Sequence, residues 1–231
     1  MVQAVIFDVD NTLYSYDRAH APAFARLKEY AARELGIGPE RFEQLHGQAD
    51  RILRARLGQP CGALHNRLLR YQILLEEVGA PLEPHALAMT RLYWDTLLGA
   101  MEPSPGIADC LPRLKAAGYR VGIGTDMTVD YQMEKLSRLG LLRWVDFVVT
   151  SEEVLAEKPD AKLFLCCAQK AKASPAHCLY IGDNLKKDIE GAHAAGMHAL
   201  WYQPDARRAA EKPDIASIQT FAGLERRLSE M

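Results

Sequence analysis

The sequence of 231 residues predicts an α/β protein, in which a parallel β-sheet covered by helices on both faces is interrupted by an inserted helical domain. Two observations predict this class. From residue 101 onward, short apolar runs alternate with helical patterns. Between the first apolar run and residue 101, the periodicity is helical only. We therefore expect residues 1–15 and 101–231 to form one core and residues 16–100 to form the insertion.

The first predicted strand is the apolar run that begins at Val5 and ends in Asp8 and Asp10. Residues two apart in a strand share a face, so the two carboxylates can address the same small volume. Two acids held that close resist ionising together unless a cation compensates or they share a proton. The run therefore predicts a site for a divalent metal, a nucleophile or acid–base chemistry. The alternative is that the aspartates cap a turn, which Asn11 and Thr12 would support.

Four amphipathic helices are predicted in the insertion, joined by short segments that contain glycine or proline. The first ends at Gly36 and the second begins near Pro39. The third starts near Leu64 and ends at Gly79, and the fourth begins at Pro84. Four such helices are typical of a small bundle.

The alternating pattern predicts the other elements of the core. The predicted strands are Tyr119–Thr125, Val145–Thr150, Cys178–Ile181 and His198–Tyr202. The predicted helices are Ile107–Ala117, Asp130–Leu139, Ala161–Ala171, Leu185–Ala195 and a last short helix over Phe221–Leu228.

The composition excludes several classes of protein. A formal net charge of −2 gives no bulk attraction to nucleic acid or to an acidic membrane, and no apolar stretch is long enough to span a bilayer. The five cysteines are odd in number and have no C-x-x-C spacing, so we expect reduced thiols in a cytoplasmic protein. No signal peptide is expected, because the chain enters the first strand at once.

Three further polar clusters stand where the predicted fold places strand ends. Thr125 and Asp126 follow a strand and precede a helix, where a hydroxyl and main-chain N–H groups make an anion cradle. Lys158 precedes another helix and can meet a phosphate or neutralise a carboxylate pair. The third cluster comprises Asp183, Asn184 and Asp188. Taken alone, the first cluster could be a helix N-cap, the second a solvated lysine and the third a turn. Ligands of parallel sheets, however, bind beyond the carboxyl ends of the strands, and this topology brings all of the clusters to that edge.

In chain order these motifs resemble those of the haloacid dehalogenase superfamily, over essentially the whole chain. They are D-x-D-x-T (Asp8, Asp10, Thr12), a threonine at a strand end (Thr125), Lys-Pro (Lys158) and G-D-N-x-x-x-D (Asp183, Asn184, Asp188). The resemblance implies a Rossmann-like core, and it implies that the four inserted helices form a cap domain of the first type.

The resemblance also implies a role for each motif. Asp8 would be the nucleophile that forms an aspartyl-phosphate, and Asp10 would be the general acid and then the general base. Thr125 and Lys158 would hold the oxygens of the transferred phosphoryl group. Magnesium would be bound by Asp8, the main-chain carbonyl of Asp10 and Asp183, with Asn184 and Asp188 in support. Asp10 favours phosphoryl chemistry, because dehalogenases of the family lack this second aspartate.

Candidates for substrate binding are fewer and less specific. Tyr14 is expected at a hinge or pocket mouth, and His65 and Arg67 lie near the start of the third inserted helix. Arg67 could meet a second anionic group. Asp126 stands where many relatives carry asparagine; it is a further candidate, although we expect it to cap the following helix.

The predicted function is a magnesium-dependent phosphomonoester hydrolase that acts on a small phosphorylated metabolite. The alternatives are a phosphomutase of the same superfamily and a catalytically idle binding protein that keeps the fold. The intact set of motif residues argues against the idle protein. The sequence pattern does not choose among sugar phosphates and nucleotides, and it predicts no oligomeric state.

Overall fold

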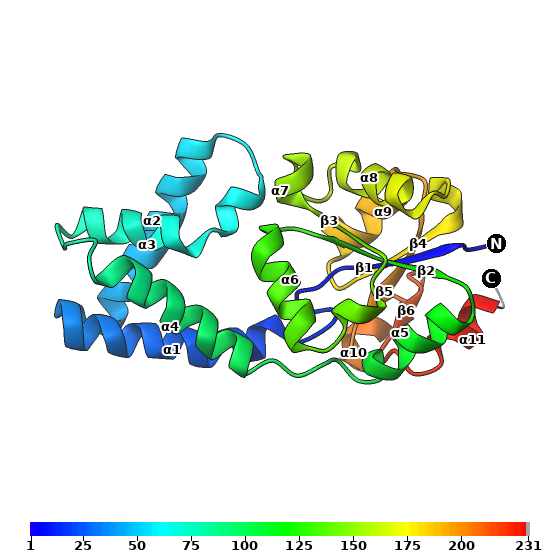
Figure 1. Cartoon of the computed structure of the whole chain (residues 1–231), viewed down its shortest axis with the longest axis horizontal. Helices are drawn as coiled ribbons and strands as arrows, with labels where there is room; N and C mark the ends of the chain where they lie inside the picture. The colour runs from blue at the N-terminus through cyan, green and yellow to red at the C-terminus, as the bar shows by residue number, and fades with distance from the viewer. Residues whose placement is uncertain (230–231) are drawn as a thin grey trace. The chain divides into compact units, whose positions relative to one another are not determined.

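The computed structural model describes residues 1–229, and the chain folds as two compact units (Figure 1). The first, called the core unit below, combines Met1–Ser15 with the chain from Glu102 onward. The second, called the helical unit, is Tyr16–Met101. Within residues 1–229, no helix is long and apolar enough to cross a membrane.

The core unit is built on a six-stranded parallel sheet. Its strands are β1 (Ala4–Phe7), β2 (Arg120–Thr125), β3 (Phe147–Thr150), β4 (Cys178–Gly182), β5 (His198–Tyr202) and β6 (Ser217–Ile218). They lie in the order β3-β2-β1-β4-β5-β6, so β1 is central, with β2 and β4 beside it. The predicted α/β class with a parallel sheet is therefore confirmed.

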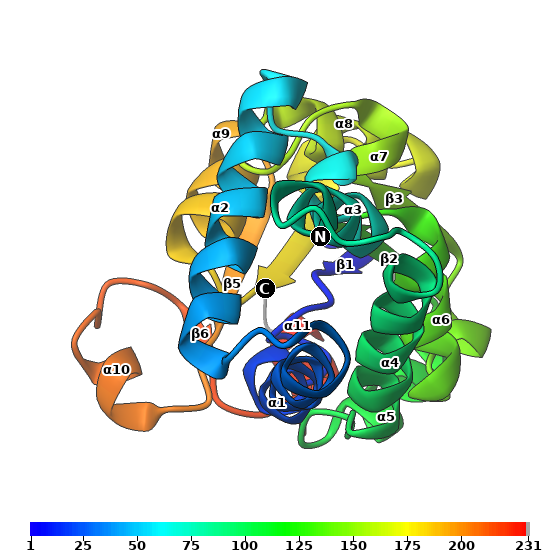
Figure 2. The ribbon, with the colours of Figure 1, turned by 90° about the vertical axis from the view of Figure 1, so that its left-hand side faces the viewer.

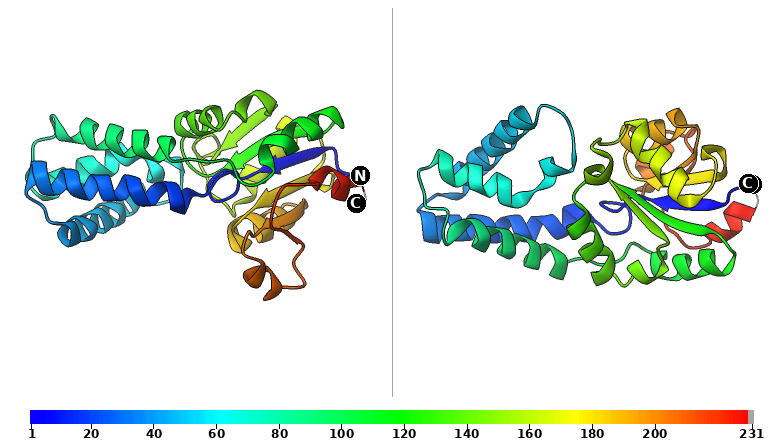
Figure 3. Two further views of the ribbon diagram at one scale, coloured as in Figure 1. Left: turned by 90° about the horizontal axis from the view of Figure 1, so that it is seen from below. Right: turned by 45° about the horizontal axis from the view of Figure 1, so that its top comes forward.

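Helices cover both faces of this sheet (Figure 3). The helices of ten or eleven residues are α5 (Ile107–Ala116), α6 (Val129–Arg138) and α8 (Ala161–Ala171). The shorter ones are η2 (Leu142–Trp144), α7 (Ser151–Val154), η3 (Pro175–His177), the π-helix η4 (Leu185–Glu190), α9 (Gly191–Ala194), α10 (Ala206–Ala210) and α11 (Leu224–Ser229). Helix α8 packs on β2 and β3, and η4 packs on β4 and β5. Helices α5 and α11 lie on the opposite face.

The side chains of β1 alternate between the two faces and are buried on both. Ile6 joins an apolar cluster with Phe164 of α8 and Tyr180 of β4. Phe7 packs edge-on against Phe221, with 5.8 Å between the ring centroids. Each side chain of this size contributes roughly 1.5–3 kcal/mol when it is fully buried. Burial on both faces explains why the strand is a continuous apolar run.

The helical unit contains four α-helices and one short 3₁₀-helix. They are α1 (Tyr16–Leu35), α2 (Pro39–Leu57), η1 (Gly62–His65), α3 (Arg67–Glu77) and α4 (His85–Gly99). Helix α1 packs against α4, and α2 packs against α3 (Figure 2). Asn66 caps α3, because its side chain accepts a hydrogen bond from the N–H of Leu69 at 3.2 Å.

Most predicted elements are present, and the differences lie in short or non-local features. The third helix of the insertion begins at Arg67 because residues Gly62–His65 form η1 instead. The helix predicted over Leu185–Ala195 is divided into η4 and α9. The sequence analysis missed α7, α10 and β6, which are too short to show a hydrophobic period.

Candidate active site

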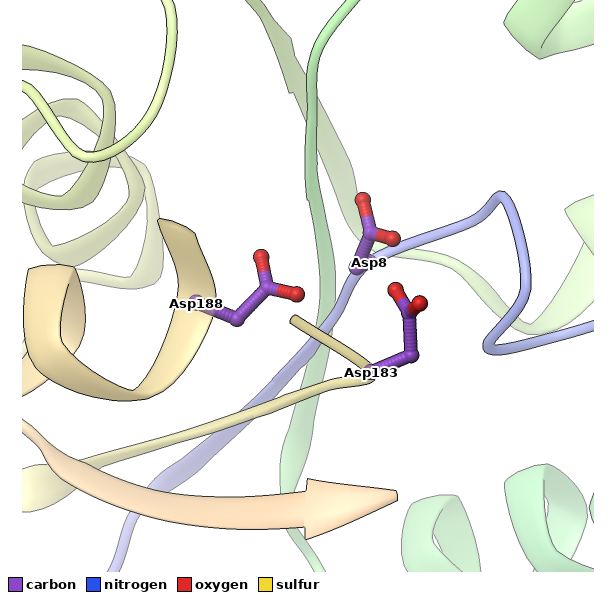
Figure 4. Close-up of side chains that lie close together, drawn as sticks. All are labelled: Asp8, Asp183 and Asp188. Atoms are coloured by element: carbon purple, nitrogen blue, oxygen red, sulfur yellow. The ribbon is translucent and has the colours of Figure 1, made fainter. Parts of the chain in front are cut away.

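Three of the predicted aspartates meet at the carboxyl ends of β1 and β4 (Figure 4). Asp8 directly follows β1, Asp183 directly follows β4, and Asp188 lies in η4. The strands are in register, and the N–H of Asp8 donates to the carbonyl of Ile181 at 2.9 Å. One carboxylate oxygen from each aspartate lies within 4.8 Å of the other two. Asp183 follows Asp8 by 175 residues in the sequence, and the sheet topology brings these aspartates to one point.

Lys158 lies within this cluster and is 5% exposed. Its Nζ donates to Oδ1 of Asp8 at 2.6 Å and to Oδ1 of Asp188 at 2.7 Å. The second oxygen of Asp188 accepts from the main-chain N–H of Asn184 at 2.9 Å. One buried ammonium group therefore bridges two buried carboxylates.

When all three aspartates are ionised, the cluster holds more negative charge than this single lysine neutralises. Burial raises the pKa of Asp8 to about 8; Lys158 opposes this shift, and the negative charges of Asp188 and Asp183 add to it. Burial and then Asp188 raise the pKa of Asp183 to about 7. The pKa of Lys158 is raised although burial opposes this, because Asp188 and Asp8 face it. A divalent cation would offset the remaining charge, and carboxylate oxygens are donors that suit Mg²⁺. The donor set therefore fits that ion.

Asp10 has a separate set of partners. Lys135 donates to both carboxylate oxygens, at 2.7 and 3.0 Å, and Nε2 of Gln132 donates to Oδ2 at 3.1 Å. The hydroxyl of Tyr14 also donates to Oδ1. Burial opposes ionisation of Asp10, but Lys135, Tyr14 and Gln132 outweigh it and hold its pKa below the usual value.

Two threonines of the motifs lie beside these carboxylates. Thr125 ends β2 and is 1% exposed; its Oγ1 accepts from Nε2 of Gln132 at 2.9 Å. Thr12 is fully buried, and its Oγ1 donates to Oδ2 of Asp8 at 3.4 Å. The core unit thus brings together Asp8, Asp10, Thr12, Thr125, Lys158, Asp183, Asn184 and Asp188.

Tyr14 was expected at a hinge or pocket mouth. It lies two residues before the first residue of the helical unit, and its side chain has no exposed surface, so it does not line a pocket mouth. It is buried because it pairs with Asp10 and Pro103 through isolated β-bridges and directs its hydroxyl to Asp10. Tyr14 therefore contacts a motif carboxylate.

Asp126 is held by lysines and does not cap α6. Its carboxylate accepts from the N–H of Lys158 at 2.9 Å and from Nζ of Lys187 at 2.8 Å. The N-cap of α6 is Thr128 instead. The expectation that Asp126 caps the helix was wrong, because its carboxylate instead accepts hydrogen bonds from the main chain of Lys158 and the side chain of Lys187, which are distant in the sequence. Lys187 offsets the additional negative charge.

His65 and Arg67 lie in the helical unit. His65 ends η1, and Arg67 is the first residue of α3. A guanidinium nitrogen of Arg67 donates to the hydroxyls of Tyr16 at 2.7 Å and Tyr93 at 3.1 Å. Its Cζ lies 4.7 Å from the centroid of the Tyr93 ring, which is a cation–π contact. His20 also contacts the Tyr93 hydroxyl, at 2.8 Å.

The sequence analysis missed Gln132 and Lys135. Both are fully buried on the face of α6 that also carries the buried Leu136. Polar residues three apart that share a face with a core leucine are an available signal, because residues at i, i+3 and i+4 are neighbours on a helix. Their target, Asp10, cannot be read from that spacing.

Comparisons with known proteins agree with this geometry. The family profile of haloacid dehalogenase-like hydrolases matches residues 2–196. The chain is 34% identical over 226 residues to a ribulose-1,5-bisphosphate 5-phosphatase from Halopiger xanaduensis, covering 96% of this chain and 94% of the relative. It is 34% identical over 199 residues to a glyceraldehyde 3-phosphate phosphatase from Methanopyrus kandleri, covering 85% of this chain and 82% of the relative.

A solved structure shares the fold over the whole chain. It is a 2-haloacid dehalogenase from Pseudomonas syringae, with a TM-score of 0.78, 28% identity, and coverage of 100% of this chain and 99% of the other. The family match confirms the resemblance read from the motifs and the prediction of an enzyme related to phosphatases. This chain belongs to the haloacid dehalogenase-like hydrolase family.

Proposed function

We propose that this enzyme is a magnesium-dependent phosphomonoester hydrolase that acts on a small phosphorylated metabolite through an aspartyl-phosphate on Asp8. The observation that carries the proposal is the buried cluster in which Lys158 bridges Asp8 and Asp188 beside Asp183. An ammonium group and a metal cation at one point can offset the charge of a dianionic phosphoryl group. The phosphatase activities named for the relatives at 34% identity support the same reaction.

In the proposed first step, a carboxylate oxygen of Asp8 bonds to phosphorus as the bond from phosphorus to the leaving oxygen breaks. Asp10 gives its proton to that leaving oxygen. The pKa of Asp10 lies below its usual value in the structure. A bound phosphate would favour the protonated form, because its negative charge repels the carboxylate. Thr125 and Lys158 would hold the phosphoryl oxygens during the transfer.

In the second step, water attacks the phosphorus of the aspartyl-phosphate and gives a proton to the ionised Asp10. The bond between phosphorus and the Asp8 oxygen breaks, and inorganic phosphate leaves. Asp8, Asp183 and the main-chain carbonyl of Asp10 would hold Mg²⁺, with Asn184 and Asp188 in support. When bound, Mg²⁺ supplies positive charge that offsets the carboxylates and the phosphoryl oxygens.

We propose residues 16–100, most of the helical unit, as the cap domain that selects the substrate. Arg67 supports a substrate with a second anionic group. Within residues 1–229, its two hydrogen-bond acceptors are neutral tyrosine hydroxyls, and its buried Nε has no hydrogen-bond partner. A guanidinium held in this way can bind a carboxylate or a phosphate bidentately. His65, two residues before Arg67, and Asp126 remain proposed substrate contacts of lower specificity.

The proposed compartment is the cytoplasm. All five cysteines, which lie within the described residues, are free thiols, and three of them are buried. Free thiols are typical of proteins in a reducing compartment. No feature of the sequence favours nucleic acid or a membrane as a partner.

The first experiment measures phosphate release from ribulose 1,5-bisphosphate, phosphoglycolate, glyceraldehyde 3-phosphate and 4-nitrophenyl phosphate, with and without Mg²⁺. The variants are Asp8→Asn and, as a matched control, Asp109→Asn at an exposed position of α5. We expect turnover that requires Mg²⁺, falls at least about 10³-fold in Asp8→Asn and is unchanged in Asp109→Asn.

Two outcomes would contradict the proposal. One is a folded wild-type protein that releases phosphate from no substrate in the panel. The other is release that survives in Asp8→Asn. Interconversion of phosphorylated sugar isomers without net phosphate release would identify the phosphomutase instead.

A further inference from the structure

Asp10 is surrounded by three side chains of the core unit that no motif of the chain includes. Lys135 donates to both carboxylate oxygens of Asp10, at 2.7 and 3.0 Å. Gln132 donates to Oδ2 at 3.1 Å, and Tyr14 donates to Oδ1. Both oxygens of the carboxylate are therefore held from α6 and from the segment after β1.

Burying Lys135 and Gln132 is costly for the fold. The side chain of Lys135 has no exposed surface, and a buried ammonium is tolerated only when it is paired. The Oε1 atom of Gln132 is buried and, among the residues that the structure describes, has no hydrogen-bond partner. Apolar side chains at both positions would avoid these two costs but would leave the carboxylate of Asp10 without its ammonium partner. The two polar groups are thus concentrated around one carboxylate, the group that they contact.

Gln132 also joins Asp10 to the proposed phosphate-binding strand end. Its Nε2 lies 2.9 Å from Oγ1 of Thr125 and 2.9 Å from the carbonyl oxygen of Asp126, in addition to its contact with Asp10. Two amide hydrogens shared among three acceptors fix the amide plane relative to all of them. The carboxylate of Asp10 therefore has a set orientation relative to the hydroxyl of Thr125.

We infer that Lys135 and Gln132 are positioning residues for Asp10, the proposed proton donor and acceptor; this inference rests on the proposed function. They hold the carboxylate at the angle from which it exchanges a proton with the leaving oxygen and with water. Lys135 and Gln132 lie three residues apart on α6, so one rigid helix sets both contacts. A misdirected carboxylate would slow proton transfer without displacing Asp8 or Lys158.

The need for a proton from Asp10 depends on the leaving group of the substrate. An alkoxide leaving group, as in a sugar phosphate, needs a proton as the bond to phosphorus breaks. The 4-nitrophenolate group leaves without one. Loss of positioning should therefore reduce kcat/KM for an alkyl phosphate and spare kcat/KM for 4-nitrophenyl phosphate, since kcat/KM reports the steps through departure of the leaving group.

The test compares wild type, Lys135→Met and Gln132→Met with glyceraldehyde 3-phosphate and 4-nitrophenyl phosphate in saturating Mg²⁺. We expect kcat/KM for glyceraldehyde 3-phosphate to fall about 100-fold in Lys135→Met and about 10-fold in Gln132→Met. For 4-nitrophenyl phosphate, kcat/KM should fall less than about 5-fold. Lys170→Met, at a partly exposed lysine of α8 that pairs with Glu153, is the matched control and should behave as wild type.

The outcomes separate this inference from the proposed function. Equal losses of kcat/KM for the two substrates would overturn the positioning role and leave the proposed hydrolase intact. Wild type that is inactive on both substrates would overturn the proposed function itself. Gln132→Met retains the ion pair between Lys135 and Asp10, so it decides the question even if Lys135→Met does not fold.

Discussion

The two units of this protein bury opposite surpluses of charge. In the core unit, Lys158 faces Asp8, Asp183 and Asp188, and the pKa values of Asp8 and Asp183 are raised to about 8 and about 7. In the helical unit, Arg67 lies near other basic groups. Within the described residues, the only acid that accepts a hydrogen bond from Arg70 is Asp50, and Asp50 also accepts one from Arg54.

Three basic groups near Arg67 have lowered pKa values, which is the opposite of the shift at Asp8 and Asp183. Burial, followed by Arg70 and Arg67, lowers the pKa of His46 to about 3. Burial and Arg67 also lower the pKa values of His20 and Arg70. Each unit is therefore prepared for a ligand of the other sign: a cation for the aspartate cluster and an anion for Arg67. Three predictions test this comparison, from the largest expected effect to the smallest.

Removing the bridging lysine should have the largest effect. Lys158→Met leaves Asp8 and Asp188 facing each other without their shared ammonium. We expect turnover to fall at least about 10³-fold and the free energy of unfolding without Mg²⁺ to fall by about 3–5 kcal/mol. Added Mg²⁺ should restore part of that stability if the cluster holds a surplus of negative charge. Assays of phosphate release and urea unfolding with and without Mg²⁺ measure these effects.

The control for this prediction is Lys187→Met, which removes a lysine whose side chain is 39% exposed and which pairs with Asp126. Its effect on the free energy of unfolding should be below about 1 kcal/mol. A loss of stability in Lys158→Met no larger than in Lys187→Met would contradict the comparison.

Removing the guanidinium group of Arg67 should have an intermediate effect, which is confined to substrate binding. For Arg67→Met we expect KM for ribulose 1,5-bisphosphate and phosphoglycolate to rise about 10–100-fold, as loss of a hydrogen bond to a charged group predicts. KM for glyceraldehyde 3-phosphate, which has no second anionic group, should change less than about 3-fold. Steady-state kinetics on the three substrates gives the comparison.

Two further variants sharpen the prediction on Arg67. Arg67→Lys keeps the charge and loses the planar fork, so it should lie between wild type and Arg67→Met. Arg91→Met removes an exposed arginine of α4 and should leave all three KM values unchanged. A rise in KM of the same size for all three substrates would show that Arg67 only supports the helical unit.

The smallest effect concerns pH and the helical unit. The pKa of His46 is about 3 in the folded protein and about 6.5 when unfolded, so the unfolded chain binds the additional proton between these values. The stability that depends on neutral His46 is therefore complete above pH 6.5 and is lost as pH falls toward 3. Between pH 8 and pH 5 this loss should be about 2 kcal/mol or less.

His46→Phe should remove that part of the pH dependence while preserving the ring contact with Phe24, whose centroid lies 5.1 Å away. Urea unfolding at pH 8 and pH 5 measures the difference, and His193→Gln, at an exposed histidine of the core unit, is the control. If wild type and His46→Phe lose the same stability between these pH values, His46 is not the group that binds the proton.

The sequence by itself determined the class of fold and the residues of the motifs. Strands buried on both faces are nearly continuous apolar runs, so β1 and β4 are visible along their whole length and β2 and β5 along most of theirs. Parallel strands end at one edge of the sheet, so Asp8, Thr125 and Asp183 could be placed together before any contact was known. Local turn chemistry also placed helix ends, as at Pro39.

Only the tertiary structure decided which polar groups are buried and what they contact. Lys135 and Asp10 are separated by 125 residues, Lys187 and Asp126 by 61, and Arg67 and Tyr16 by 51. A helix that carries Gln132 and Lys135 is equally stable with these side chains in water, and no local pattern tells that they turn to Asp10. Periodicity reports which face of an element is buried, whereas the partner of a buried charge depends on packing between segments far apart in the chain.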